Sequence, residues 1–182
     1  GSEGTLAVVT KVTLRLLHRP ESVRTLLAAF DSTDAAGNVV SDIIAAGIIP
    51  AAIEMMDRTT IRAAEAAVHP GFPDAEAVLI VELDGPKNEV ATLFERVEAV
   101  CAKHDGWGIQ VARDEAQRGR IWMGRKAAFA AMGRVSPSYY VQDGVIPRSK
   151  LPEVLRRIRQ LEKDSGLTIG NVFHAGDGNL HP

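Results

Sequence analysis

Two histidines near the end of the chain, His174 and His181, are spaced so that one turn can bring their side chains together. Between them lies the segment Gly176-Asp177-Gly178. Glycine reaches positive φ angles at little steric cost, so the backbone can fold back here. Neutral imidazole is the commonest metal ligand in proteins. The spacing therefore indicates a metal site, while a tight turn without any metal fits the same residues.

Two histidines do not complete such a site, because open catalytic zinc sites usually have three protein ligands and one vacant position. The chain ends at Pro182, one residue after His181. We therefore expect a third ligand in sequence beyond Pro182.

A second candidate for chemistry lies on a helix that we expect at residues 114–132. Trp122 and Arg125 lie nearly one helical turn apart on this helix, and Arg118 lies four residues before Trp122. A guanidinium group can bind a carboxylate through two parallel hydrogen bonds, and a tryptophan wall keeps water away. Arg118 fits a surface position, so we favour Arg125 as a substrate ligand. Glu54 is also a candidate, because it is a charged residue within an apolar strand.

Two further segments carry weaker signals. The chain opens with a glycine-rich loop whose backbone amides could approach a cofactor phosphate or ring: Gly1, Ser2, Gly4 and Thr5. A remnant of a removed tag explains Gly1 and Ser2 equally well. The segment 139–144, which contains Tyr140, adds polar groups to an expected strand edge, and an ordinary edge strand is an equally good interpretation.

Composition limits the classes of function. The hydrophobic content of 46% and the charged content of 24% are ordinary for a globular protein. A net charge of -2 gives no electrostatic reason to expect nucleic acid or an anionic membrane as a partner. No apolar run approaches the ~18 residues that a membrane span needs. The single cysteine, Cys101, excludes an internal disulfide and fits a reducing compartment.

Strands and helices are expected to alternate along the chain. Before residue 50 we predict a strand at 8–16 and helices at 21–30 and 38–46. After it we predict strands at 51–56, 77–83, 108–113, 139–146 and 167–173, with helices at 57–68, 88–104, 114–132 and 149–163. This order indicates an α+β fold, a ferredoxin-like antiparallel sheet covered by helices. A parallel doubly wound sheet is the alternative, but the chain has no Gly-x-Gly-x-x-Gly fingerprint.

Four ordered motifs together resemble one family of proteins. They occupy residues 1–6, 49–57, 140–147 and 174–181. The chain resembles the FAD-linked oxidases of the vanillyl-alcohol-oxidase type, and most closely the flavin subunits of glycolate oxidases. D-lactate and D-2-hydroxyglutarate dehydrogenases are related to these subunits.

The resemblance implies a division into two parts. Residues 1–20 would be the end of an FAD-binding domain and supply its last strand. Residues 21–182 would be the substrate-binding cap domain, truncated at its C-terminus. FAD would be the cofactor, contacted by the four residues of the opening loop. Ala7 departs from the family, which often has glycine there, and so weakens that assignment.

The resemblance also implies roles for individual residues. His174 and His181 would bind a divalent metal, commonly zinc. Arg125 would pair with the carboxylate of a 2-hydroxy acid, and Tyr140 and Asn179 would be further substrate ligands. The hydride would pass from the α-carbon to FAD, and the catalytic residues would lie beyond Pro182.

Two departures from the hydroxyglutarate enzymes bear on the substrate. Phe129 and Val141 stand where those enzymes carry a threonine and a lysine. Without these donors for a second carboxylate, a small monocarboxylate such as glycolate or lactate is favoured.

The resemblance further implies FAD-binding and iron-sulfur partner subunits, with a cytoplasmic location and membrane association through those subunits. A non-catalytic ferredoxin-like module that docks a partner subunit is the main alternative. A zinc hydrolase is disfavoured, because no His-Glu-x-x-His motif accompanies the two histidines.

Overall fold

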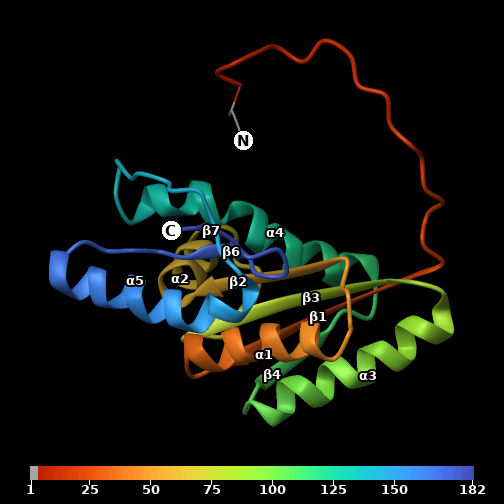
Figure 1. The fold of residues 1–182 in the computed structure, drawn as a ribbon. Coiled ribbons are helices and arrows are strands. Elements are labelled where there is room, and N and C mark those ends of the chain that lie inside the picture. Colours follow the sequence, from red (N-terminus) through yellow and green to blue (C-terminus); the bar gives the residue numbers. More distant parts are fainter. Residues whose placement is uncertain (1–3) are drawn as a thin grey trace.

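The computed structural model describes residues 4–182 as one antiparallel sheet with helices on both faces (Figure 1). The strands are β1 (Ser22–Phe30), β2 (Ala52–Asp57), β3 (Ala77–Gly85), β4 (Trp107–Val111), β5 (Gly144–Val145), β6 (Val172–His174) and β7 (Asn179–His181). The α-helices are α1 (Thr33–Ala45), α2 (Arg58–Val68), α3 (Lys87–Lys103), α4 (Glu115–Ala131) and α5 (Leu151–Ser165). A short 3-10 helix, η1 (Met132–Arg134), directly follows α4, and another, η2 (Arg148–Lys150), directly precedes α5. The predicted α+β class with an antiparallel sheet is confirmed.

The sheet has the strand order β4-β1-β3-β2-β6-β7-β5. Its first four strands reproduce the ferredoxin-like arrangement, because β3 lies between β1 and β2 and is antiparallel to both. The chain order from β2 to β6 also follows the predicted alternation of strands and helices. The hairpin β6–β7 and the short strand β5 then extend the sheet beyond β2, where β6 pairs with β2.

Both faces of the sheet are covered, which explains one wrong prediction. Helices α1, α3 and α5 pack on one face, and α2 and α4 lie over the other (Figure 1). In β1, Leu26 and Ala28 face the first layer while Leu27 faces the second, and all three are fully buried. A strand buried on both faces is a continuous apolar run without alternation. For this reason the helix predicted at 21–30 is wrong, and the segment is β1.

Other differences concern the lengths and ends of elements. The predicted strand at 8–16 is absent: residues 7–20 form no strand, and their large apolar side chains are exposed. The predicted strand at 139–146 is reduced to the two residues of β5. The helix predicted at 38–46 begins earlier, at Thr33, because the Ser32 hydroxyl accepts a hydrogen bond from the backbone of the first turn.

A buried cap joins the ends of two strands that carry candidate site residues. Asp57, the last residue of β2, accepts a hydrogen bond from the Thr60 amide at 3.0 Å and so begins α2. Its other oxygen accepts a hydrogen bond from Asn171 Nδ2 at 2.7 Å. Burial raises the pKa of Asp57 to about 6. This cap fixes the start of β6 against the end of β2, and thereby the position of His174.

Helix α4 lies close to the segment that follows α2, and two glycines of α4 allow a stability test. A methyl group on Gly124 would lie 2.5 Å from the Phe72 ring and 2.7 Å from Pro70. We expect Gly124→Ala to destabilise the protein by about 1–3 kcal/mol, because such overpacking forces neighbours apart. Gly119 of the same helix has open space, so Gly119→Ala should stabilise it by about 0.5–1 kcal/mol. Urea unfolding of both variants gives the two values, and effects of equal sign would contradict the close packing.

Within residues 4–182, no helix combines the length and the hydrophobicity that crossing a membrane requires.

Candidate active site

The hairpin of β6 and β7 places the two histidines side by side. His174 ends β6, His181 ends β7, and their ring centroids are 5.3 Å apart with an interplanar angle of 88°. Gly178 in the turn has a φ of 73°, and a methyl group there would collide with the carbonyl oxygen of Ile146. Only glycine fits this position without strain. The convergence that the Gly-Asp-Gly segment predicts is therefore present.

The spacing of these rings fits two ligands of a single metal ion. A zinc ion binds histidine nitrogen at about 2 Å with tetrahedral angles, which puts the centroids of two bound imidazoles about 5 Å apart. The distance of 5.3 Å between His174 and His181 agrees with this value. Two ligands are still too few, and within residues 4–182 no group of three or more histidine, cysteine or acidic side chains could hold a metal ion.

The surroundings of His181 keep its imidazole in the form that binds metals. Burial lowers its pKa below the usual value, and the nearby His174 and Arg125 lower it further. The carboxylates of Asp143 and Glu54 oppose this effect, and that of Asp143 lies 3.6 Å from His181 Nδ1. Because a metal ligand must be a neutral imidazole, the lowered pKa favours ligation at neutral pH.

Glu54 connects the histidine pair to helix α4. It lies on β2 directly opposite His174 of β6, and its side chain is 8% exposed. Oε1 lies 2.9 Å from His174 Nδ1, and Oε2 accepts a hydrogen bond of 2.8 Å from Arg125 Nε. The sequence indicates Glu54 as an unusual charge in an apolar strand but gives no sign of these two partners. Their contacts span 120 and 71 residues of sequence.

Arg125 occupies the buried face of α4 and points toward the sheet. Its side chain is 7% exposed, and Nη2 lies 2.7 Å from Glu54 Oε2. Nη2 is nevertheless buried without a properly angled hydrogen bond among the described residues. A buried guanidinium nitrogen without such a partner is unusual, because buried polar groups are normally satisfied. Arg125 therefore retains unused capacity to bind an acceptor.

Two more residues complete the wall around the histidines. The Phe129 ring contacts the edge of His181 at a centroid distance of 5.7 Å. Asn179 is the cross-strand neighbour of His174, and its Oδ1 is buried without a hydrogen bond among the described residues. The cluster thus combines an apolar side with polar groups that can accept or donate.

The remaining predicted site residues lie elsewhere or outside the described residues. Tyr140 is in the loop before β5 with 82% of its surface exposed, and no described contact connects it to the histidines. Gly1 and Ser2 fall outside residues 4–182, whereas Gly4, with a φ of 75°, and Thr5 are exposed. The structure thus brings together Arg125, Asn179, His174 and His181, but it does not bring Tyr140 to them.

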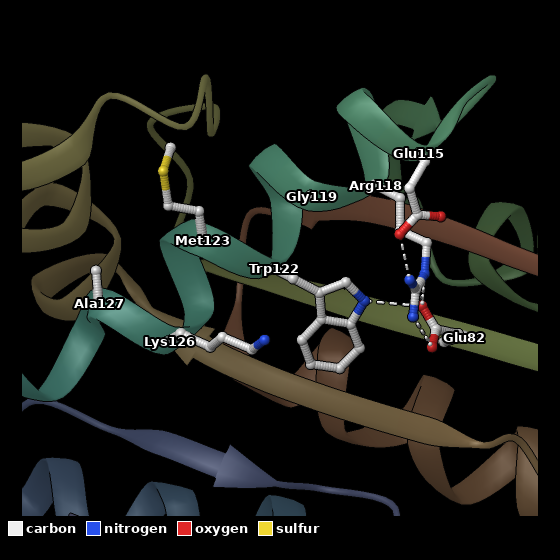
Figure 2. A pocket seen from close by; sticks show the side chains of 8 residues that line it. All are labelled: Glu82, Glu115, Arg118, Gly119, Trp122, Met123, Lys126 and Ala127. Carbon is white, nitrogen blue, oxygen red and sulfur yellow. Dashed lines mark hydrogen bonds and ion pairs between the residues drawn. The ribbon is translucent and has the colours of Figure 1, made fainter.

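A second arginine–glutamate pair lies two helical turns earlier on α4. Arg118 donates to both carboxylate oxygens of Glu82 at 2.8 and 2.9 Å, and Trp122 Nε1 donates to Oε2 at 2.7 Å. Trp122 therefore serves this pair rather than Arg125. Figure 2 shows these contacts. The residues around them line a hollow of about 750 Å³. Its lining residues are Glu82, Glu115, Arg118, Gly119, Trp122, Met123, Lys126 and Ala127.

Similarity to known proteins covers nearly the whole chain. Residues 19–182 match the family described as FAD linked oxidases, C-terminal domain. The chain is 54% identical to the glycolate oxidase subunit GlcD of Escherichia coli K12 and 40% identical to that of Bacillus subtilis. It is 30% identical to the mitochondrial D-lactate dehydrogenase [cytochrome] of Arabidopsis thaliana. Each of these alignments covers the whole of this chain. The chain spans only 37% of the length of the E. coli protein, 39% of the B. subtilis protein and 32% of the A. thaliana protein.

Solved structures share the fold at low sequence identity. An alkyldihydroxyacetonephosphate synthase superposes with a TM-score of 0.67 at 14% identity, covering 89% of this chain and 35% of that one. The 4-ethylphenol oxidase of Gulosibacter chungangensis gives a TM-score of 0.62 at 14% identity, covering 92% and 40%. These likenesses support the fold alone.

Proposed function

Because the chain belongs to the family of FAD-linked oxidase C-terminal domains, we propose that it forms the substrate- and metal-binding part of a flavin-dependent 2-hydroxyacid dehydrogenase. The family confirms the resemblance carried by the four sequence motifs. The relatives named as glycolate oxidase subunits and a D-lactate dehydrogenase support a 2-hydroxy acid as the substrate class.

One observation carries this proposal: a buried arginine with unused hydrogen-bonding capacity lies beside two converging imidazoles. Arg125 binds the substrate carboxylate, since a guanidinium group matches a carboxylate better than any other side chain does. His174 and His181 hold a divalent metal with one further ligand, and Asn179 binds the substrate from the neighbouring strand. The two ends of a 2-hydroxy acid are thus fixed from opposite sides.

FAD and a divalent metal would supply the chemistry of the reaction. When bound, FAD would be the acceptor of the hydride from the α-carbon, and a divalent metal held by His174 and His181 would lower the pKa of the substrate hydroxyl. The residues of this chain hold the carboxylate, orient the hydroxyl and keep the α-carbon in one position. Placing the reacting atoms in this way is itself a large part of catalysis.

The wall around the histidines favours a small substrate. Phe129 packs against His181 and offers no donor for a second carboxylate. Val141 also lacks such a donor. Glycolate or lactate therefore fits this side of the site better than a dicarboxylate does, because a carboxylate against a phenyl ring would lose hydration without a partner.

The N-terminal residues are assigned to FAD binding within the same proposal. Residues 1–20 supply the last strand of an FAD-binding domain, and residues 21–182 form the cap domain. The exposed apolar side chains support this assignment, because they would become buried in such a domain: Leu6, Val8, Val9, Val12, Leu14, Leu16 and Leu17. Figure 1 shows residues 4–20 running away from the sheet. Gly1, Ser2, Gly4 and Thr5 would contact FAD, and Tyr140 would reach the substrate from its exposed loop.

Partner subunits belong to the proposal as well. The relatives of E. coli and B. subtilis are named as subunits, which supports an assembly. We assign it an FAD-binding and an iron-sulfur partner, through which the protein would associate with a membrane. No contact of the described residues specifically favours the alternative of a non-catalytic docking module, and the buried polar cluster argues for catalysis.

Anaerobic flavin reduction in the full-length protein tests the proposed function. Glycolate or D-lactate should bleach the flavin absorbance, and D-2-hydroxyglutarate should do so far more slowly. The present 182-residue chain is the control, and we expect it to purify without flavin and to oxidise none of these acids. Absence of bleaching with every 2-hydroxy acid would contradict the function, and a chain that retains flavin through gel filtration would contradict the division into domains.

A further inference from the structure

Glu54 contacts both a proposed metal ligand, His174, and the proposed carboxylate anchor, Arg125. Each of its oxygens serves a different partner: Oε1 lies against His174 Nδ1 at 2.9 Å, and Oε2 against Arg125 Nε at 2.8 Å. The side chain is buried between the sheet and α4. Neither the sequence motifs nor the proposed function gives this carboxylate a task.

The contact with His174 determines which ring nitrogen carries the proton. A carboxylate accepts a hydrogen bond, so Nδ1 of His174 must be the protonated nitrogen and Nε2 keeps its lone pair. The His174 side chain is 43% exposed, which leaves room for a ligand. Histidines that bind metals commonly donate their second ring nitrogen to a carboxylate in this way.

The contact with Arg125 determines which edge of the guanidinium group Glu54 occupies and which edge is left for a substrate carboxylate. Glu54 occupies the edge formed by Nε and Nη2. Nη1 forms no hydrogen bond with any residue that the structure describes, and Nη2 has a second N–H that Glu54 does not use, so the edge formed by Nη1 and Nη2 can meet an incoming carboxylate. Shifting the Glu54 carboxylate would therefore move the anion-binding group and the metal-binding group together.

We propose that Glu54 is a positioning residue that sets both the tautomer of His174 and the orientation of Arg125, and so fixes the distance between the metal and the carboxylate anchor. This inference rests on the proposed function. A glutamine at position 54 cannot replace the carboxylate, because only one of its two polar atoms accepts hydrogen bonds. If the amide nitrogen faces His174, the proton of that ring moves to Nε2. If it faces Arg125, two donors oppose each other.

The second pair on α4 provides a matched control. Glu82 also binds an arginine of α4 from the sheet, but its other partners are Trp122 and Thr25 rather than a histidine. If Glu54 only held α4 on the sheet, Glu54→Gln and Glu82→Gln would have the same kinds of effect. A positioning role predicts a difference that is specific to metal binding.

The test compares both variants as full-length, flavin-loaded proteins. Zinc affinity is measured by competition with a chelator, together with the unfolding temperature and kcat/KM for glycolate. We expect Glu54→Gln to weaken zinc binding by about 10- to 100-fold and to lower kcat/KM, while Glu82→Gln keeps the wild-type zinc affinity. Zinc affinity that is unchanged in Glu54→Gln, or lowered equally in both variants, would overturn the inference.

Two further outcomes are distinguishable. If Glu54→Gln does not load flavin, Glu54→Asp replaces it, with Glu82→Asp as its control. Aspartate keeps the charge but withdraws the carboxylate by one methylene, so weaker zinc binding supports the inference and unchanged zinc binding overturns it. A wild-type protein that binds no zinc would contradict the metal site of the proposed function, and this inference with it. If the wild-type protein binds zinc and the Glu54 variants keep the wild-type zinc affinity, the result contradicts the inference alone.

Discussion

Replacing Arg125 with lysine in the full-length protein is expected to lower kcat/KM for every 2-hydroxy acid by about 10- to 100-fold. The charge remains, but a lysine has one ammonium group instead of a planar fork, so it cannot bind Glu54 along one edge and a substrate carboxylate through two parallel hydrogen bonds along another. Hydrogen bonds to charged groups contribute about 1.5–3 kcal/mol each, which corresponds to this loss. Steady-state kinetics with glycolate and D-lactate measure it.

A second arginine of α4 serves as the control for this experiment. Arg120 is exposed and forms no hydrogen bond or ion pair within the part of the chain that the structure describes. Arg120→Lys should therefore leave kcat/KM and the unfolding temperature unchanged. If Arg125→Lys also leaves kcat/KM unchanged while it lowers the unfolding temperature, Arg125 only clamps the helix to the sheet. If Arg125→Lys lowered kcat/KM equally for glycolate and for a neutral alcohol substrate, Arg125 would likewise not be a carboxylate ligand.

The fold follows from the sequence wherever a local pattern determines an element. Asp57 caps α2, as expected, and the apolar run predicted as a strand at 77–83 forms β3, which continues to Gly85. Prediction failed for β1, because a short apolar run fits a helix as well as a strand until both covering layers are known. It also failed at residues 8–16. Their β-branched residues favour a strand, but a strand needs a partner, and none pairs with them among residues 4–182.

The candidate site is predictable in its parts but not in its connections. The glycines at 176 and 178 indicate the turn that joins His174 to His181, and the helical spacing indicates Arg125. The link through Glu54 depends on β6 pairing with β2, a contact between segments 120 residues apart. Nothing local in the sequence encodes this pairing. The only sign of it is a carboxylate in an apolar strand, which must find a partner wherever it is buried.

The largest expected effect is that of His181→Ala on the metal content of the full-length protein. The distance of 5.3 Å between the ring centroids fits two imidazoles bound to one ion. Because the proposed site has few protein ligands, removing one of them should weaken zinc binding by more than about 100-fold. Elemental analysis should then find far less than one zinc per flavin. Flavin reduction by glycolate should slow in proportion, because the hydroxyl loses the ion that lowers its pKa.

His104→Ala is the matched control, because this histidine is also partly buried and paired with a carboxylate, at 2.9 Å from Asp42. It lies at the end of α3, on the layer opposite α4, so it should retain full zinc content and normal flavin reduction. Any loss of zinc content or of flavin reduction in His104→Ala would therefore reflect lowered stability alone. Full zinc content and normal reduction in His181→Ala would show that the T-shaped pair of rings only packs the end of the sheet. In that case the carboxylate anchor Arg125 would have to act without a metal beside it.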